Sequence, residues 1–321
     1  MKRTKFLWIT DPWHTLDHEH DTTLRLAQEA LAMGHESWWC DVKSIRLQSG
    51  RALLEASQIL SIGNDRSASS ISLGKPRTCS PSRFHSLQYR VDPPVDLAYL
   101  QPLQILRVGG VDTVNPMASL FLANEKLEGM LIPRRSPPSL VAAQWEPLSQ
   151  FGRREKKTVM KPLHLAQSRG IELLDWTSSR NIEKARKLIT AATENFQRPV
   201  LLQRFLPAIA HGETRLWLLD GKLLATARKL PLQHDFRVNI DRGSKLVAHA
   251  PSAAEKRTAA AIGARLRALG VRMAAVDLID GYITDFNITS PGLITQMEQV
   301  TGRNLARAII AALSRRSSIS E

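Results

Sequence analysis

The hydrophobic pattern at the start of the chain predicts a strand, a helix and a second strand. An apolar run over residues 6–10 predicts the first strand. Apolar positions between residues 24 and 33 then recur at helical spacing behind Asp21, a residue suited to cap a helix, and Gly34 ends that pattern. Residues 37–42 form the next apolar run. Strand–helix–strand order is typical of a parallel α/β sheet, which binds ligands near the carboxyl ends of its strands.

The rest of the chain alternates between short apolar runs and helical patterns. We expect strands over 103–108, 158–162, 171–174 and 199–206, and helices over 118–130, 181–195, 252–269 and 302–313. Polar stretches predict a linker at 134–138 and loops at 63–84 and 235–243, the first partly disordered and the second mobile. Residues 314–321 predict a frayed tail.

Two Asp-Gly pairs predict β-hairpins. Asp220-Gly221 separates strand-like runs over 214–219 and 222–230, which carry Arg215 and Arg228 on their two arms. Asp280-Gly281 lies at the centre of a second hairpin within residues 275–298.

Three oxygen-bearing side chains flank the second turn, namely Asp277, Asp285 and Asn287. Asp285 and Asn287 share a strand face, and Asp277 joins them if the connection has an odd number of residues, for example through a bulge at Gly281. Two carboxylates and an amide oxygen are hard ligands that suit Mg²⁺. Acids beside a hairpin are also often merely solvated, and the pattern by itself leaves both interpretations open.

A second candidate is the arginine of the segment Tyr89-Arg90-Val91-Asp92-Pro93-Pro94. Proline pairs stiffen a loop, and an arginine held in this way suits bidentate capture of a carboxylate. An ordinary loop arginine is the alternative.

Composition narrows the class of protein. The 321 residues are 43% hydrophobic and 23% charged, which fits a globular protein of two or three domains. No apolar run approaches the length of a membrane span, and the apolar segment at the start is too short for a signal peptide. The chain has only two cysteines, which is typical of a protein in the reducing cytoplasm. The net charge of +14 comes from scattered basic residues without a nucleic-acid motif. It therefore favours an anionic small substrate such as a nucleotide, with neither nucleic acid nor membrane expected as a partner.

Several motifs together resemble bacterial glutathione synthetase, a member of the ATP-grasp superfamily, nearly from end to end. They are Asp11-Pro12, Arg90-Val91-Asp92-Pro93-Pro94-Val95-Asp96, Val114-Asn115-Pro116, Asn124-Glu125-Lys126-Leu127, residues 203–209 (QRFLPAI) and residues 285–291 (DFNITSP). The resemblance implies an α/β chain with an ATP-grasp fold behind an N-terminal doubly wound, pre-ATP-grasp parallel-sheet domain. We expect the N-terminal substrate-binding domain over 1–119, the ATP-grasp domain over 120–316 and the tail over 317–321.

The resemblance also implies roles for individual residues. Lys126 and Lys161 would bind phosphates of ATP, Gln203, Phe205 and Leu206 would line the adenine pocket, and Glu213 would face the ribose. Asp277, Asp285 and Asn287 would hold Mg²⁺. Arg90, Arg215 and Arg228 would face the acyl substrate and its phosphorylated intermediate, with Arg215 and Arg228 catalytic. Arg237 and Asn239 resemble part of a lid, and Thr289 and Ser290 belong to the substrate-binding signature.

The sequence departs from the family pattern in three places. Residues 164–170 (HLAQSRG) contain a single glycine where the family has a glycine-rich loop over the phosphates, and Arg169 or His164 could supply charge instead. The middle metal ligand is Asp285 in place of a glutamate, and the segment 237–243 lacks a run of glycines.

Three functions therefore remain at this point. The favoured one is an ATP-dependent carboxylate–amine ligase that acts through an acyl phosphate on a small acid, such as a γ-glutamyl dipeptide, and an amine. The second is a catalytically altered homologue that binds nucleotide or ligand without turnover. The third is a basic nucleic-acid-binding protein. The sequence leaves open whether the protein forms a homo-oligomer.

Overall fold

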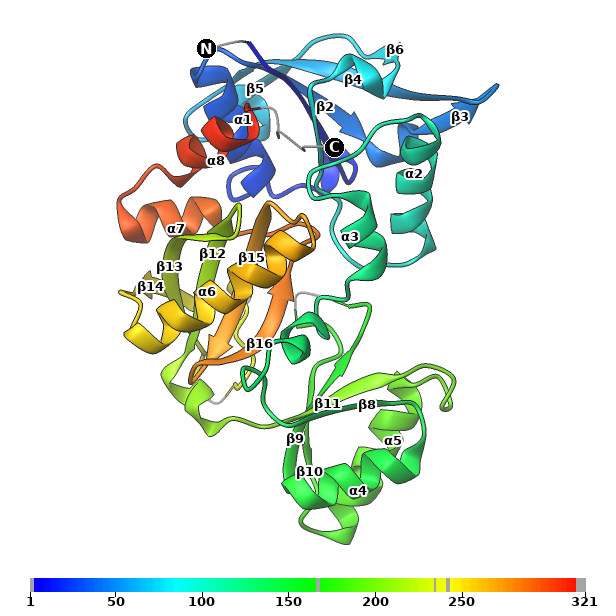
Figure 1. The fold of residues 1–321 in the computed structure, drawn as a ribbon, viewed down its shortest axis with the longest axis vertical. Coiled ribbons are helices and arrows are strands. Elements are labelled where there is room, and N and C mark those ends of the chain that lie inside the picture. Colours follow the sequence, from blue (N-terminus) through cyan, green and yellow to red (C-terminus); the bar gives the residue numbers. More distant parts are fainter. Residues whose placement is uncertain (1–2, 166–167, 234, 241–242, 316–321) are drawn as a thin grey trace.

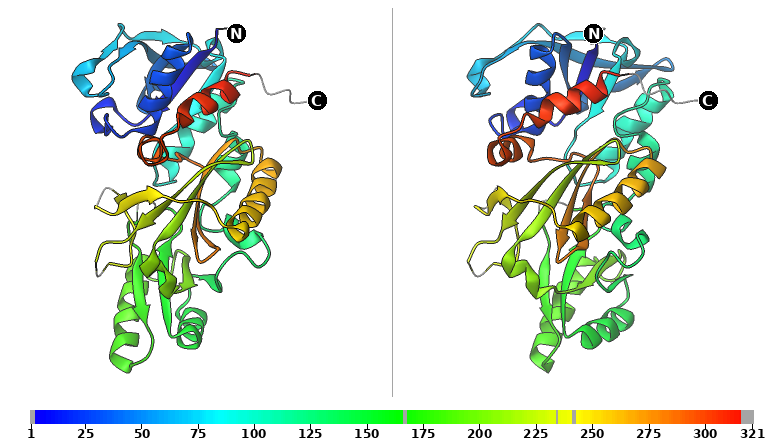
Figure 2. Two further views of the ribbon diagram at one scale, coloured as in Figure 1. Left: turned by 90° about the vertical axis from the view of Figure 1, so that its left-hand side faces the viewer. Right: turned by 60° about the vertical axis from the view of Figure 1, so that its left-hand side comes forward.

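The computed structural model describes residues 3–165, 168–233, 235–240 and 243–315, and it places three sheets one after another along the long axis (Figure 1). The chain builds the N-terminal sheet first and then the sheet at the far end. It returns through the middle sheet to two C-terminal helices that lie beside the first helix. The two ends of the described chain consequently lie at the same end of the molecule (Figures 1 and 2).

The N-terminal sheet has a parallel centre and an antiparallel flank. Strands β1 (Lys5–Thr10), β2 (Glu36–Asp41) and β7 (Ser86–Tyr89) are parallel, as expected. The predicted helix is confirmed as α1 (Thr22–Ala32), and the Asp21 carboxylate caps it by accepting a hydrogen bond from Leu24 N at 2.8 Å. The flank consists of β4 (Arg51–Ile62), which runs antiparallel to β2, and of three short strands paired with β4, namely β3 (Arg46–Gln48), β5 (Ile71–Leu73) and β6 (Arg77–Cys79).

Three predictions in this region differ from the structure. Residues 103–108 are not a strand but the end of helix α2 (Leu97–Val108), whose N-cap is Asp96. The segment 63–84 is not wholly a loop, because it carries β5 and β6 and buries Cys79. The predicted helix over 118–130 is likewise shorter: α3 spans Met117–Leu122, and a separate 3-10 turn covers Glu128–Leu131.

The far lobe is a four-stranded antiparallel sheet covered by two helices (Figure 1). Its strands run in the order β10 (Glu172–Asp175), β9 (Lys157–Pro162), β11 (Val200–Arg204) and β8 (Ser139–Ala142), and its helices are α4 (Trp145–Glu155) and α5 (Ser179–Ala192). Gly152 lets α4 approach the sheet closely, because a Cβ at this position would lie 2.1 Å from the Trp176 ring. The three strands predicted at 158–162, 171–174 and 199–206 are confirmed here to within a few residues.

The middle sheet contains both predicted hairpins. Its strand order is β14 (Lys245–Ala248), β13 (Lys222–Leu230), β12 (Glu213–Leu219), β15 (Met273–Ile279) and β16 (Tyr282–Asn287), with helix α6 (Ala253–Ala268) packed on one face (Figure 1). The other face is directed toward the cavity described below.

The C-terminal helices connect the middle sheet to the N-terminal lobe. The single helix predicted over 302–313 is preceded by a second one, so that α7 (Ile294–Thr301) and α8 (Leu305–Leu313) are separated at Gly302. Arg25 of α1 binds Glu298 of α7 at 2.7 Å, and α1 packs on both C-terminal helices. The predicted tail over 317–321 lies outside the described residues.

Candidate active site

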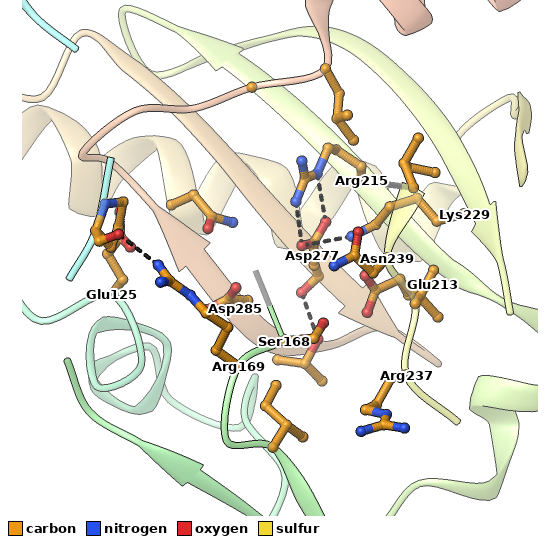
Figure 3. A pocket seen from close by; sticks show the side chains of 18 of the residues that line it. Glu125, Ser168, Arg169, Glu213, Arg215, Lys229, Arg237, Asn239, Asp277 and Asp285 are labelled. Carbon is orange, nitrogen blue, oxygen red and sulfur yellow. Dashed lines mark hydrogen bonds and ion pairs between the residues drawn. The ribbon is translucent and has the colours of Figure 1, made fainter. Parts of the chain in front are cut away.

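A cavity of about 620 Å³ lies where the three lobes meet. Its wall includes the segment before α1, the Arg90–Pro93 segment, the inner strands of the far lobe and the cavity-facing side of the middle sheet. Figure 3 shows charged side chains converging on it from several of these elements. Fifteen of the predicted site residues line this cavity, and Arg228 does not: Arg90, Lys126, Lys161, Gln203, Phe205, Leu206, Glu213, Arg215, Arg237, Asn239, Asp277, Asp285, Asn287, Thr289 and Ser290.

The register of the second hairpin brings the predicted metal ligands to one face. Asp277 lies opposite Asp285 and Ala275 lies opposite Asn287, so all three oxygen-bearing side chains point to the same side of the sheet. The extra residue that achieves this is Thr284, because the pairing shifts from Asp277–Asp285 to Leu278–Ile283. The bulge was expected at the glycine and instead lies in the second strand.

Asp277 is the centre of a buried charge cluster (Figure 3). Arg215 donates to both of its oxygens, at 2.9 and 2.7 Å, and Lys229 Nζ lies 3.0 Å from Oδ2. Lys229 also pairs with Glu213. Burial alone would raise the pKa of Asp277, but Arg215 and Lys229 outweigh it and hold this pKa well below its usual range. Burial raises the pKa of Glu213, with Lys229 acting in the opposite direction.

Asp285 and Asn287 offer oxygens that a metal could use. Asp285 Oδ1 is buried and has no hydrogen-bond partner within the described residues. The Asn287 amide nitrogen donates to Ala275 O at 3.0 Å, so its amide oxygen is the group that remains for a ligand. An orphaned buried carboxylate oxygen beside another carboxylate and an amide is a donor set that fits Mg²⁺.

The two predicted phosphate-binding lysines are buried against protein oxygens. Lys161 Nζ donates to Thr284 O at 2.7 Å and to Gln203 Oε1 at 3.1 Å, and Lys126 Nζ donates to Leu165 O. Burial lowers the pKa of Lys161, and the neighbouring Asp285 charge acts against that change. Both ammonium groups reach the cavity, where an anion could replace their present acceptors.

The end of the cavity near the far lobe is apolar. Phe205, Leu206, Ile209 and Val159 line it, and Phe236 approaches Phe205 edge-on with ring centroids 6.2 Å apart. A largely apolar slot of this kind suits a nucleobase. The predicted lid residues lie beside it: Asn239 lines the wall, and Arg237 does too while binding Asp235 at 3.1 Å.

At the opposite end, Arg90 is a buried cation with unused bonding capacity. Its Nε donates to Thr23 Oγ1 at 3.3 Å and its Nη2 to Pro291 O at 2.9 Å, while Nη1 has no hydrogen-bond partner among the residues that the structure describes. Burial lowers the pKa of Arg90, and Asp21 and Asp92 partly compensate. A carboxylate that accepts a hydrogen bond from Nη1 would give this nitrogen the partner that it lacks.

Glu125 is a residue whose role the sequence did not reveal. Its Oε1 accepts from Ile288 N at 2.6 Å, from Thr289 N at 2.8 Å and from Thr289 Oγ1 at 2.9 Å. It thereby fixes the turn that follows β16, and it already engages the hydroxyl predicted to contact substrate. The motif containing Lys126 included this acid, but no periodicity connects Glu125 with residues 288 and 289.

Arg228 lies on the other face of β13, away from the cavity. It pairs across the hairpin with Thr214, and its Nη2 lies 3.3 Å from His249 Nε2 and 3.9 Å from Glu255. The pairing runs Leu218–Leu223 and then Trp217–Ala225, so a bulge reverses the alternation beyond the turn. The basic residue of β13 on the same face as Arg215 is therefore Lys229, which pairs with Glu213.

The loop that departs from the family pattern contacts the N-terminal lobe. Arg169 Nη2 donates to Pro93 O at 2.7 Å, and Val95 N donates to His164 O at 3.2 Å. Arg169 also lines the cavity, whereas Gln167 lies outside the described residues.

Comparison with known proteins places the chain in a family. The family described as "Prokaryotic glutathione synthetase, ATP-grasp domain" matches residues 125–302, and "Prokaryotic glutathione synthetase, N-terminal domain" matches residues 4–120. This chain belongs to the prokaryotic glutathione synthetase family. Glutathione synthetase of Prochlorococcus marinus is 30% identical over 310 residues, covering 96% of this chain and 97% of the relative. That of Rhodopseudomonas palustris is 30% identical over 301 residues, covering 93% and 94%.

Solved structures confirm the ATP-grasp fold that the family match gives for this glutathione synthetase homologue. D-cycloserine synthetase DcsG matches with a TM-score of 0.66 at 18% identity, covering 96% of this chain and 99% of that one. The macrocyclase MdnC of Microcystis aeruginosa, bound with its precursor peptide, matches with a TM-score of 0.64 at 14% identity, covering 97% and 99%. By its family the chain is an ATP-grasp ligase of the class that forms C–N bonds, and ATP and Mg²⁺ are typical of that family. The described part of the chain contains no helix with the length and apolarity needed to span a membrane.

Proposed function

We propose that this protein joins a carboxylic acid to an amine at the expense of ATP, through an acyl phosphate. The observation that carries the proposal is the convergence in one cavity of an apolar slot, buried lysines, a pair of facing carboxylates and the buried Arg90. Phosphoryl transfer to a carboxylate needs positioned charge more than covalent help from the protein. Each of these groups supplies one part of that requirement.

The nucleotide would lie with its base between Phe205 and the lid and its phosphates toward the lysines. Lys161 and Lys126 reach the same cavity, so phosphate oxygens could take over the bonds that these lysines now make to protein oxygens. A charge-assisted hydrogen bond of this type contributes about 1.5–3 kcal/mol. Glu213, proposed to face the ribose, lines the same wall.

Asp285, Asn287 and Asp277 would hold Mg²⁺. When bound, the metal would supply positive charge that offsets the negative charge on the phosphates during transfer. The fixed register of the hairpin keeps the three side chains on one face, and the buried Asp285 Oδ1 is the oxygen with most to gain from a cation.

Arg90 would hold a carboxylate of the acid substrate at the end of the cavity opposite the base. The reacting carboxylate oxygen would attack the γ-phosphorus, and ADP would leave with the electrons of the broken P–O bond. The neutral amine would then attack the acyl carbon, and the C–O bond to phosphate would break. The nitrogen would lose a proton, which leaves with the product as hydrogen phosphate, and an amide would form. Arg215 binds Asp277, one of the three proposed metal ligands, and it is proposed to stabilise the charge on the intermediate.

The acid is proposed to be a γ-glutamyl dipeptide or a related small acid, in keeping with the family. The test is to incubate the purified protein with ATP, Mg²⁺ and a panel of acids and amines, including γ-glutamylcysteine with glycine, and to measure ADP release and product mass. We expect ADP formation that depends on both an acid and an amine. An absence of ADP with every pair would overturn the ligase assignment.

One observation favours a second candidate, a nucleotide-binding homologue without turnover. The segment that should cradle phosphates has a single glycine, and it is joined to the N-terminal lobe at Pro93 and Val95. The same assay separates the two functions when it is paired with calorimetry. Binding of ADP without any product would support this second function.

A further inference from the structure

The cluster around Asp277 is balanced in charge without any ligand. It contains two acids, Glu213 and Asp277, and two bases, Arg215 and Lys229, and all four side chains are at most 13% exposed. Both oxygens of Asp277 are already occupied: Oδ1 by Arg215 Nε, and Oδ2 by Arg215 Nη2 and Lys229 Nζ. A metal that uses Asp277 must therefore enter a place where cations already lie.

The two bases differ in how readily they could leave. Arg215 binds both carboxylate oxygens with a rigid planar fork, so its departure would break two aligned bonds. Lys229 makes one bond to Asp277 from a flexible four-carbon stem, and it has an alternative partner in Glu213. Lys229 is thus the cation that a metal would displace first.

We propose that Lys229 is a positioning residue that controls metal binding, because its ammonium occupies Asp277 until a divalent cation arrives and is then released toward the phosphates. The inference rests on the proposed function for the existence of the metal site. It adds an internal competitor for that site and a reason for metal and nucleotide to strengthen each other's binding. Lys229 lines the cavity, so its ammonium can turn from Asp277 to an anion within the same space.

The direct test measures metal affinity without nucleotide. Binding of Mn²⁺ is followed from the electron paramagnetic resonance signal of the free ion, in wild type, Lys229→Met and Arg228→Met. We expect Lys229→Met to bind Mn²⁺ about tenfold more tightly, because the competing cation is gone. Arg228→Met is the matched control, since it removes a cation from the next position on the opposite face of the same strand. An affinity of Lys229→Met equal to or weaker than wild type would overturn the proposal.

Two further variants guard against a folding defect. Glu213→Gln/Lys229→Met removes both members of one ion pair, so no buried charge is left without its partner, and it too should bind Mn²⁺ more tightly. Lys229→Arg retains a cation beside Asp277 and should stay within about threefold of wild type. Circular dichroism verifies the fold of each variant. Equal Mn²⁺ affinity in wild type and the double variant would overturn the competition, and no Mn²⁺ binding by any of them would overturn the metal site as well.

The second half of the proposal predicts a change in linkage. The ratio of ADP dissociation constants without and with Mg²⁺, measured by calorimetry, reports the coupling between metal and nucleotide. Because the released ammonium would contribute to that coupling, we expect the ratio to fall at least about threefold in Lys229→Met and to stay unchanged in Arg228→Met. The same ratio in wild type and Lys229→Met would overturn the release toward phosphate.

Discussion

At the scale of single residues, the facing acids Asp277 and Asp285 occupy opposite situations. Asp277 is saturated by Arg215 and Lys229, whereas Asp285 keeps a buried oxygen without a hydrogen-bond partner among the described residues. A group that stays unsatisfied inside a protein costs stability, so its retention needs a reason. The most direct reason is a ligand, and this makes Asp285 the sharper of the two residues to test.

We predict that Asp285→Asn removes Mg²⁺-dependent ADP formation while leaving the fold intact. The amide keeps the shape but loses the charge that a metal needs. Because Asp285 Oδ1 has no present partner, the melting temperature should stay within about 3 °C of wild type, the equivalent of about 1 kcal/mol. Calorimetric melting and the ADP assay check the two halves separately. Full Mg²⁺-dependent activity in Asp285→Asn would refute its assignment as a ligand.

At the scale of elements, the sequence predicted most strands and helices but not the bulges that decide on which face of the sheet each side chain lies. Asp-Gly pairs located both hairpins, and Asp21 and Gly34 bounded α1, because these signals depend on neighbouring residues. The faces of the hairpins depend on the bulges at residues 224 and 284, which follow from packing across the sheet. One bulge reversed the face of Arg228, and the other brought Asp277 to the predicted face by a different route.

Long-range pairing explains the remaining differences at this scale. Residues 71–73 and 77–79 read as loop because each strand has three residues and is defined by its partner β4. The segment 103–108 has a strand-like composition, yet Asp96 starts a helix that continues through it and buries Leu103 and Leu106. The local propensity of a segment is a weak guide to its secondary structure where tertiary packing determines which conformation it adopts.

The start of α6 supplies a test of pH dependence. Glu255 and Ser252 form a capping box, and Glu255 also binds His249 and Thr214. Burial raises the pKa of Glu255, but these hydrogen bonds outweigh it and lower this pKa to about 2 from 4.5. A lowered carboxyl pKa stabilises the fold above the unfolded value, and that stability is lost as the pH falls toward the folded value.

We therefore predict that Glu255→Gln lowers the free energy of unfolding at neutral pH by about 1–2 kcal/mol. The difference from wild type should shrink as the pH falls from about 4.5 to about 2, the window set by the two pKa values. Urea unfolding across this range measures it. A difference that is constant with pH would mean that the charge of Glu255 contributes nothing. Glu183→Gln, on the exposed side of α5, is the control.

At the scale of the whole molecule, one buried amide connects the N-terminal segment to the middle sheet. Asn115 donates to Met273 O and Ile288 O, both at 2.7 Å, and accepts from Arg272 N and Met273 N, both at 2.9 Å. These backbone groups lie at the start of β15 and directly after β16. The same amide thus holds the hairpin of the candidate metal site against the N-terminal lobe.

Asn115→Ala is predicted to lower the free energy of unfolding by about 3 kcal/mol, because it leaves three buried backbone groups and one partly buried backbone group without that partner. Urea denaturation measures the change. Gln101→Ala, at an exposed position of α2, should stay within about 0.5 kcal/mol of wild type. A comparable loss in both variants would show that the bonds of Asn115 have no special weight.

Arg169 also connects the far lobe to the N-terminal lobe, through its bond to Pro93 O. Pro93 belongs to the segment that carries Arg90, so Arg169 links the loop over residues 164–170 to the segment proposed to hold the acid. We predict that Arg169→Ala lowers kcat/KM at least about tenfold, equivalent to about 1.4 kcal/mol of transition-state stabilisation.

The kinetic and binding constants that change in Arg169→Ala identify the cause of the loss. A role in joining the lobes raises KM for the acid and leaves the ADP dissociation constant unchanged, whereas a direct contact with phosphate weakens ADP binding. Arg180→Ala, an exposed change on α5, should have wild-type kinetics. If Arg169→Ala matches that control in every constant, Arg169 has no part in the reaction, and the single-glycine loop works without the added charge.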